Sequence, residues 1–158
     1  MSAVSVPQEI ALLLEPIQQK DTEVTDPDVT ANFITLEAEM NKMGDINYPQ
    51  CINLAQEILK NESKHLRAVG WLTLAWLRTE GLVGFRRGLI LLLELIRKFP
   101  DQLYPQKSAQ QNKAIQYFNS EKRFQTSLKQ IHSSAENSEI LGELVKLLEA
   151  ISKECSKI

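Results

Sequence analysis

The chain has 158 residues, of which 43% are hydrophobic and 24% are charged, and its formal net charge is −2. This length fits one domain, which buries roughly 70% of the surface of its unfolded chain and so needs neither disulfides nor metals. The near-neutral charge argues against a nucleic-acid binder and against a polybasic membrane anchor. The sequence has only six glycines and six prolines, which disfavours a turn-rich β-sandwich or barrel.

Apolar residues recur every three or four positions, the spacing of amphipathic helices. In the first part of the chain this spacing, with prolines at expected helix starts and stops, predicts three helices. Asp26 and Pro27 have the residue types favoured at a helix cap and first turn. Cys51 lies on an apolar stripe, and we expect it to be a small buried hydrophobe. The three predicted helices cover residues 7–14, 26–43 and 48–61.

The next two predicted helices form the most apolar part of the chain. Ser63 is expected to cap the first, and Gly81 suits the left-handed position that ends it. A short link over residues 82–84 leads into a second apolar helix, which Pro100 ends. Both helices are apolar nearly all round, so neighbouring helices must bury them. We therefore expect this helical hairpin to be the centre of the core.

After an irregular stretch at residues 101–107, a long polar helix is expected to begin at a Ser108 cap and run to residue 131. A turn at residues 132–137 precedes a last amphipathic helix, whose apolar face comprises Ile140, Leu144, Leu147, Leu148 and Ile151. No segment alternates with a period of two, so we assign no strands. The predicted fold class is all-α, a bundle of six or seven helices around a central apolar hairpin.

The residue pattern predicts no catalytic, cofactor-binding or metal site. The two histidines, His65 and His132, lack the positioned partners of a general base, and His65 reads as a solvated helix-start residue. No phosphate-binding glycine loop occurs, and Cys51 and Cys155 belong to no metal-binding motif. Basic residues around the hairpin are expected to cover the core with solvated charged ends. They include Lys64, Arg67, Arg78, Arg86 and Arg87.

The hairpin and the segment after it nevertheless carry a specific motif. It reads S-K-H-L-R-A-V-G-W-L from residue 63, E-G-L-V-G-F-R-R-G-L from residue 80, and D-Q-L-Y-P from residue 101, with L-L-E-P-I upstream at 13–17. This pattern closely resembles the ImpA N-terminal region of TssA-like proteins of bacterial type VI secretion systems. His65 stands where that family has an acidic residue, and Pro100 where it has a tryptophan. The matching positions are Ser63, Lys64, Leu66, Arg67, Trp71, Leu72, Glu80, Gly81, Gly84, Gly88, Leu89, Asp101, Leu103 and Pro105.

The resemblance implies a structural protein and no enzyme or cofactor. TssA-like proteins help to assemble the contractile tail, so the implied partners are baseplate, tube, sheath or membrane-complex proteins, with no nucleic acid and no membrane insertion. The implied location is the bacterial cytoplasm, with recruitment to the secretion apparatus docked on the inner membrane. Residues 1–158 would be one domain, the N-terminal module of a longer protein. Most matching residues are glycines or apolar, so we expect them mainly to determine the fold.

Two expectations stay open beside this reading. A generic helical adaptor that binds a partner peptide or helix is the alternative function. Self-association through the last helix, or through the aromatic region of Tyr104, Tyr117 and Phe118, is expected if apolar surface stays exposed there.

Overall fold

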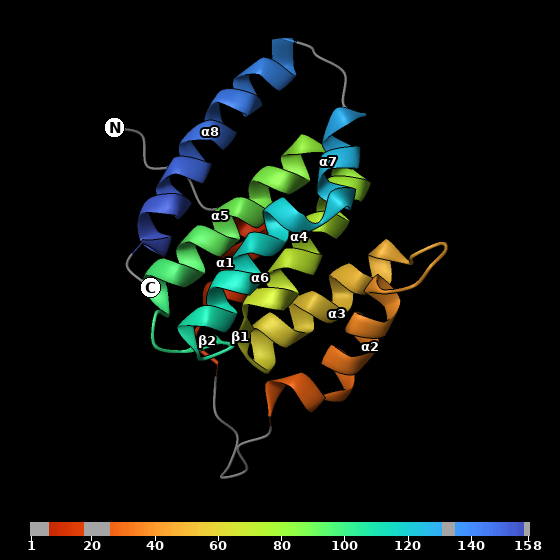
Figure 1. The fold of residues 1–158 in the computed structure, drawn as a ribbon, viewed down its shortest axis with the longest axis vertical. Coiled ribbons are helices and arrows are strands. Elements are labelled where there is room, and N and C mark those ends of the chain that lie inside the picture. The colour runs from red at the N-terminus through yellow and green to blue at the C-terminus, as the bar shows by residue number, and fades with distance from the viewer. Residues whose placement is uncertain (1–6, 18–25, 131–134, 157–158) are drawn as a thin grey trace.

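The computed structural model describes residues 7–17, 26–130 and 135–156, with side chains outside 135–138. This part of the chain is helical apart from one very small sheet (Figure 1), which confirms the predicted all-α class. In chain order the elements are α1 (Gln8–Ala11), η1 (Leu12–Leu14), η2 (Pro27–Val29), α2 (Ala31–Met40), α3 (Tyr48–Asn61), β1 (Lys64–His65), α4 (Leu66–Glu80), α5 (Leu82–Lys98), β2 (Leu103–Tyr104), α6 (Ser108–Ser120), α7 (Lys122–Lys129) and α8 (Ala135–Cys155); η1 and η2 are short 3-10 helices.

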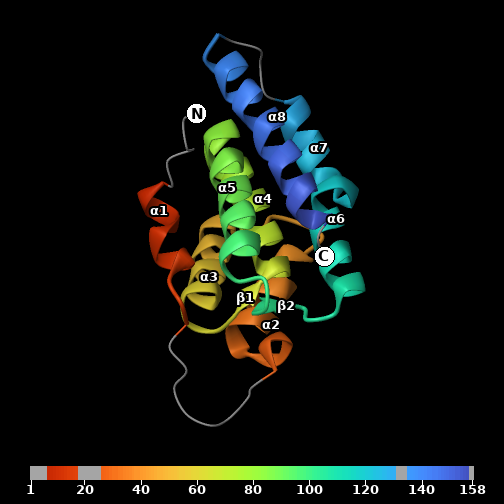
Figure 2. The ribbon, with the colours of Figure 1, turned by 90° about the vertical axis from the view of Figure 1, so that its left-hand side faces the viewer.

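The predicted hairpin, α4 and α5, lies at the centre of the fold. Helix α3 packs on one side of α4 and in turn carries α2, while α6 and α7 cover another side (Figures 1 and 2). Helix α8 packs on α5, and η1 contacts both α3 and α5. Every residue of α4 from Leu66 to Leu77 is buried except Arg67, so neighbours surround this helix as its apolar sequence predicts.

Three glycines shape the hairpin. Gly81 has a φ of +68°, as predicted for the residue that ends α4, but it alone joins the two helices. The expected link at residues 82–84 is wrong, because α5 begins at Leu82. A Cβ on Gly84 would overlap the backbone carbonyl of Trp76, and one on Gly88 would overlap the Thr73 side chain. At Gly84 the two helix backbones approach so closely that only hydrogen fits, and at Gly88 the Thr73 side chain fills the space that a Cβ would need.

The prediction of no strands is wrong by one small sheet. β1 and β2 pair in parallel, with Lys64 opposite Leu103 and His65 opposite Tyr104. Two residues are too few to show a period of two, so the sequence pattern contains no signal for these strands. Because β1 takes up residues 64 and 65, α4 starts at Leu66, and the cap is His65 instead of Ser63.

Lys64 is 1% exposed, which corrects the expected solvated charge. Its Nζ donates hydrogen bonds to the carbonyl oxygens of Leu13 and Glu15, each at 2.7 Å, and of Leu59 at 2.8 Å. An ammonium group has three hydrogens to donate, so these three carbonyls use its full capacity. Lys64 therefore ties the N-terminal segment and the end of α3 to β1. Among the other basic residues of the hairpin, Arg87 is also buried.

The C-terminal half differs from the prediction in three ways. The long helix expected over 108–131 is two helices, because Glu121 adopts an extended backbone and its side chain caps α7. Ser108 is the first residue of α6, and Lys107 holds the cap position. The turn expected at 132–137 lies partly outside the described residues, and residues 135–137 belong to α8.

Helix α8 buries only part of its apolar surface. Leu144, Leu147 and Ile151 are buried as predicted, whereas Leu148 is 48% exposed. Leu148 points away from the core because it falls on the same side of the helix as Leu141 and Val145, which are also exposed. Leu141, Val145 and Leu148 thus form an exposed apolar stripe. Self-association through α8 stays a prediction.

Candidate functional site

A cleft of about 460 Å³ opens where the beginning of α4 meets η2, the end of β2 and one side of α6. We call it the Arg67 cleft. Its walls combine aromatic, basic and acidic side chains contributed by segments far apart in the sequence. They are Asp28, Asn41, His65, Arg67, Trp71, Pro105, Gln110, Lys113, Ala114 and Tyr117.

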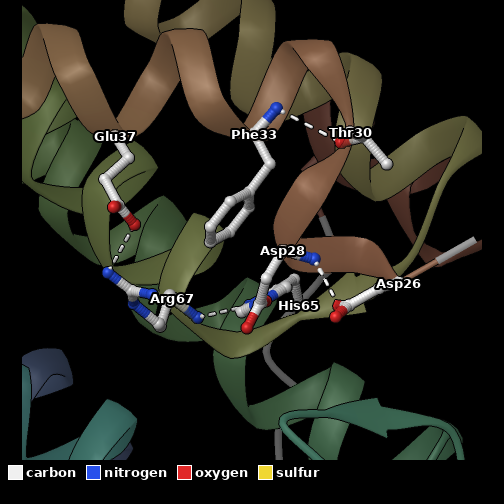
Figure 3. A network of polar contacts seen from close by, with 7 residues as sticks. All are labelled: Asp26, Asp28, Thr30, Phe33, Glu37, His65 and Arg67. Atoms are coloured by element: carbon white, nitrogen blue, oxygen red, sulfur yellow. Dashed lines mark hydrogen bonds and ion pairs between the residues drawn. The ribbon is translucent and has the colours of Figure 1, made fainter.

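His65 anchors the cleft, and it is 1% exposed, which corrects its predicted solvated position. Its Nδ1 accepts the backbone N–H of Arg67 at 3.2 Å and so caps α4, while Nε2 lies 2.6 Å from Asp28 Oδ1 (Figure 3). Since Nδ1 accepts, the proton of the neutral ring sits on Nε2 and is donated to Asp28. Burial lowers the pKa of His65, against the opposing effect of Asp28. The ring is therefore neutral at pH 7.

Asp28 reaches His65 because the turn before α2 is capped at two successive points. Asp26 accepts the N–H of Asp28 at 2.9 Å, and Thr30 accepts the N–H of Phe33 at 3.3 Å (Figure 3). The prediction that Asp26 caps a helix is confirmed, although the helix that it caps is the short η2. These caps fix Asp28 against β1.

Arg67 lies over two aromatic rings. Its guanidinium lies 4.8 Å from the ring of Trp71 and 5.4 Å from that of Phe33. It also donates to Glu37 at 2.8 Å (Figure 3). The Arg67 side chain is nevertheless 41% exposed. The two ring contacts and one ion pair thus fix the orientation of a cation that stays partly exposed.

Tyr117 of α6 forms the facing wall. Its ring lies over Gly70, where an added Cβ would come within 2.8 Å of Tyr117 Cδ1. Burial raises the pKa of Tyr117 to about 12, and its hydroxyl accepts a hydrogen bond from Arg123 at 3.4 Å. The phenol therefore stays protonated in the physiological range. Lys113, one turn earlier, is exposed at the rim.

The cleft is arranged for binding. Both nitrogens of His65 are already engaged, so this ring has no free lone pair with which to accept a proton from a substrate. Arg67 and Lys113 offer donors, Asp28 and Glu37 offer acceptors, and Trp71 and Tyr117 offer apolar rings. Such a mixed surface matches a protein segment that carries both charged and apolar groups.

We expect protonation of His65 to make stability fall with acidification. Because its folded pKa is depressed below the ordinary histidine value of 6.5, the unfolded chain takes up a proton first as the pH drops. Stability should therefore decrease below about pH 6.5 until the folded ring also protonates. His65→Asn keeps a capping oxygen but removes this titration, so its stability should change less over the same window. Urea denaturation between pH 7 and pH 5 measures the free energy of unfolding of the wild type and of His65→Asn. Parallel pH profiles of the two proteins would refute a buried, neutral His65.

The residues that match the family motif fall into three places. Arg67, Trp71 and Pro105 line the Arg67 cleft. Asp101 and Leu103 line a second cavity, near the end of α5 and the beginning of α6. The remaining positions lie in the hairpin, in β1 and directly before β1. They are Ser63, Lys64, Leu66, Leu72, Glu80, Gly81, Gly84, Gly88 and Leu89. Glu80 forms a two-pronged ion pair with Arg87. The buried Ser63 hydroxyl has no hydrogen-bond partner among the described residues.

Sequence reasoning missed the roles of His65, Asp28 and Tyr117. One local signal was present: Asp26 and Thr30 are residue types that cap helices and turns. Two such residues close together indicate a tight turn, which holds Asp28 between them. No local pattern shows that this turn meets β1, or that α6 lies across α4.

Two further observations concern the described part of the chain only. No three side chains among His, Cys, Asp and Glu gather there as a metal site would require. No helix in it combines the length and the apolar character needed to cross a bilayer.

The fold and the cleft define an all-α domain built on a tightly packed hairpin, with an open cleft of mixed charge. The chain belongs to the ImpA N-terminal family of type VI secretion systems, whose family model matches residues 14–131. This confirms the resemblance drawn from the motif and makes the protein a TssA-like type VI secretion component.

A solved structure shares the fold. It is the N-terminal domain, including the conserved ImpA_N region, of the TssA component of the type VI secretion system from Burkholderia cenocepacia. The TM-score is 0.56 at 17% sequence identity, and the match covers 99% of this chain and 83% of that chain. No curated protein matches the chain in sequence.

Proposed function

We propose that this domain is a non-enzymatic docking module that helps to assemble the secretion apparatus, and that the Arg67 cleft receives its partner. One observation carries the proposal: an exposed guanidinium is fixed on Trp71 within a cleft that three family-motif positions line, Arg67, Trp71 and Pro105. Arginine and aromatic residues in pockets are the groups that dominate binding energy at protein interfaces.

The electrostatics of the cleft favour a protein partner. Two cations, Arg67 and Lys113, and one carboxylate, Asp28, line the cleft, and Glu37 beside it pairs with Arg67. Little positive charge is therefore left to attract nucleic acid or anionic lipid. The proposed partner is then a baseplate, tube, sheath or membrane-complex protein, which the domain would meet on the cytoplasmic side of the apparatus. A generic adaptor would use the same chemistry, but family membership favours partners from the secretion system.

The test is a pull-down of the purified domain against each of these four partner classes, with the cleft altered at its exposed rim. Lys113→Glu reverses one charge without touching the core and should weaken capture of the cognate partner at least about tenfold. Lys60→Glu, on the exposed side of α3, is the matched control and should leave capture unchanged. Equal capture by both variants would reject the cleft as the docking site. Capture of none of the four classes would reject the proposed function.

A further inference from the structure

The cationic groups of the Arg67 cleft have hydrogens left to donate. A guanidinium has five N–H groups. Arg67 gives one of them to Glu37 at 2.8 Å (Figure 3), and no other described residue accepts from the rest of its side chain. Lys113 is exposed and forms no ion pair with a described residue. The cleft therefore offers two cationic donors, one on α4 and one on α6.

The charges around these donors limit what the cleft can accept. Because His65 is neutral, the lining carries two positive charges, on Arg67 and Lys113, and one negative charge, on Asp28. One oxygen of Asp28 already accepts from the His65 ring at 2.6 Å. Glu37 lies outside the lining and shares Arg67. This balance suits one carboxylate, since Asp28 and Glu37 would repel a doubly charged phosphate.

Arg67 is oriented before any ligand arrives. Its guanidinium lies 4.8 Å from the ring of Trp71 and 5.4 Å from that of Phe33. The planar guanidinium presents its donors as a fork that matches a carboxylate. The side chains of Arg67 and Glu37 are 41% and 40% exposed, and an ion pair this exposed contributes little to stability. Arg67 can therefore take a second carboxylate beside Glu37 at little cost.

Apolar surface lies beside the two cations. Pro105 and Tyr117 are half-buried and line the cleft, and so does Ala114, the neighbour of Lys113 on α6. Aromatic rings at such sites bury large apolar areas against a partner. A segment that binds here would gain most by placing an apolar side chain next to its acid.

We propose that the Arg67 cleft recognises a single acidic side chain, aspartate or glutamate, in its protein partner, with an apolar residue beside it. The carboxylate accepts hydrogen bonds from the Arg67 guanidinium and the Lys113 ammonium, while the apolar residue packs on Pro105 and Tyr117. This inference rests on the docking role proposed for the cleft and specifies the chemistry of the partner.

The test uses the whole chain, labelled with ¹⁵N, and two short blocked peptides, N-acetyl-Glu-Phe-amide and N-acetyl-Gln-Phe-amide. We expect the Glu peptide to shift the side-chain Nε–H of Arg67 and the backbone N–H of Lys113 in a saturable way. The Gln peptide should bind at least about fivefold more weakly, because it lacks the charge. Equal binding of the two peptides, no saturable shift, or tighter binding of inorganic phosphate would overturn the proposal.

Glu37→Gln gives the sharpest variant. Glutamine keeps an oxygen that accepts from Arg67 but removes the charge that competes with the ligand, so the Glu peptide should bind about two- to fivefold more tightly. If Glu37 only positioned Arg67, its replacement would leave binding unchanged or weaken it, and either result would overturn the proposal. Lys113→Gln should weaken the Glu peptide at least about threefold. Lys60→Gln, on the exposed side of α3, is the control and should bind as the wild type does.

The pull-down described above separates this inference from the proposed function. Capture of a partner that depends on Lys113 but is weakened by Glu37→Gln would refute recognition of an acid and leave the docking role standing. Saturable binding of the Glu peptide without capture of any of the four partner classes would support recognition of an acid and refute the docking role.

Discussion

Lys64→Met is expected to lower the free energy of unfolding by about 3 kcal/mol or more. Methionine fills a similar volume but donates no hydrogen bond, so the carbonyls of Leu13, Glu15 and Leu59 lose their shared partner. Each buried acceptor left unpaired costs about 1–3 kcal/mol. Urea denaturation at pH 7 measures the loss. Lys60→Met, at an exposed position of α3, is the control and should change stability by less than about 0.5 kcal/mol.

The same variant has a signature in pH. Burial lowers the pKa of Lys64 from 10.5 to about 8. Between these values the unfolded chain holds a proton that the folded chain has released, so the contribution of Lys64 to stability falls as the pH drops from 10.5 to 8 and rises as the pH increases. The stability gap between wild type and Lys64→Met should widen from pH 8 to pH 10, and a gap that stays constant would contradict the assigned burial. Burial raises the pKa of Cys51 to about 11 and that of Tyr117 to about 12, but both groups titrate in both proteins and cancel in the difference.

Gly84→Ala should also be strongly destabilising, with a loss of about 2 kcal/mol or more. Alanine normally stabilises a helix interior by about 1 kcal/mol relative to glycine. At Gly84 the new Cβ would overlap the Trp76 carbonyl, which is backbone and can move only if the two hairpin helices separate. Overpacking of this kind costs about 1–3 kcal/mol, and occasionally more. Thermal and urea unfolding measure the net change.

The chain provides the matched control for this substitution. Gly142 lies in α8, and apart from its chain neighbours and the nearby backbone of its own helix no atom lies within 4 Å of the position that a Cβ would take there. Gly142→Ala should therefore be neutral or stabilising by up to about 1 kcal/mol. The two variants make the same chemical change in two helices, and only the space around the Cβ differs. If Gly84→Ala were as stable as Gly142→Ala, the close approach of α4 and α5 would be refuted.

The candidate sites were only partly predictable from the sequence. The family motif singled out Arg67, Trp71 and Pro105 without showing that they share a cleft. Gln111 lies outside that motif and carries no local signal, since a glutamine on a polar helix is ordinarily exposed. Its burial follows only from the tertiary packing around the cavity that it lines.

Most of the helices and the hairpin core follow from the amino-acid sequence alone, because helix formation and amphipathic burial depend on residues three and four positions apart. The break between α6 and α7 at Glu121 does not. Asp26, Gly81 and the apolar run of α4 took the roles that their types predict. The pairing of residues 64 and 65 with residues 103 and 104, which makes His65 the cap of α4, emerges only from the three-dimensional fold. The burial of Lys64 also emerges only from the fold, because two of the three carbonyls that compensate its charge, those of Leu13 and Glu15, come from a distant segment. Contacts between such segments depend on how helices pack, and short-range spacing does not encode them.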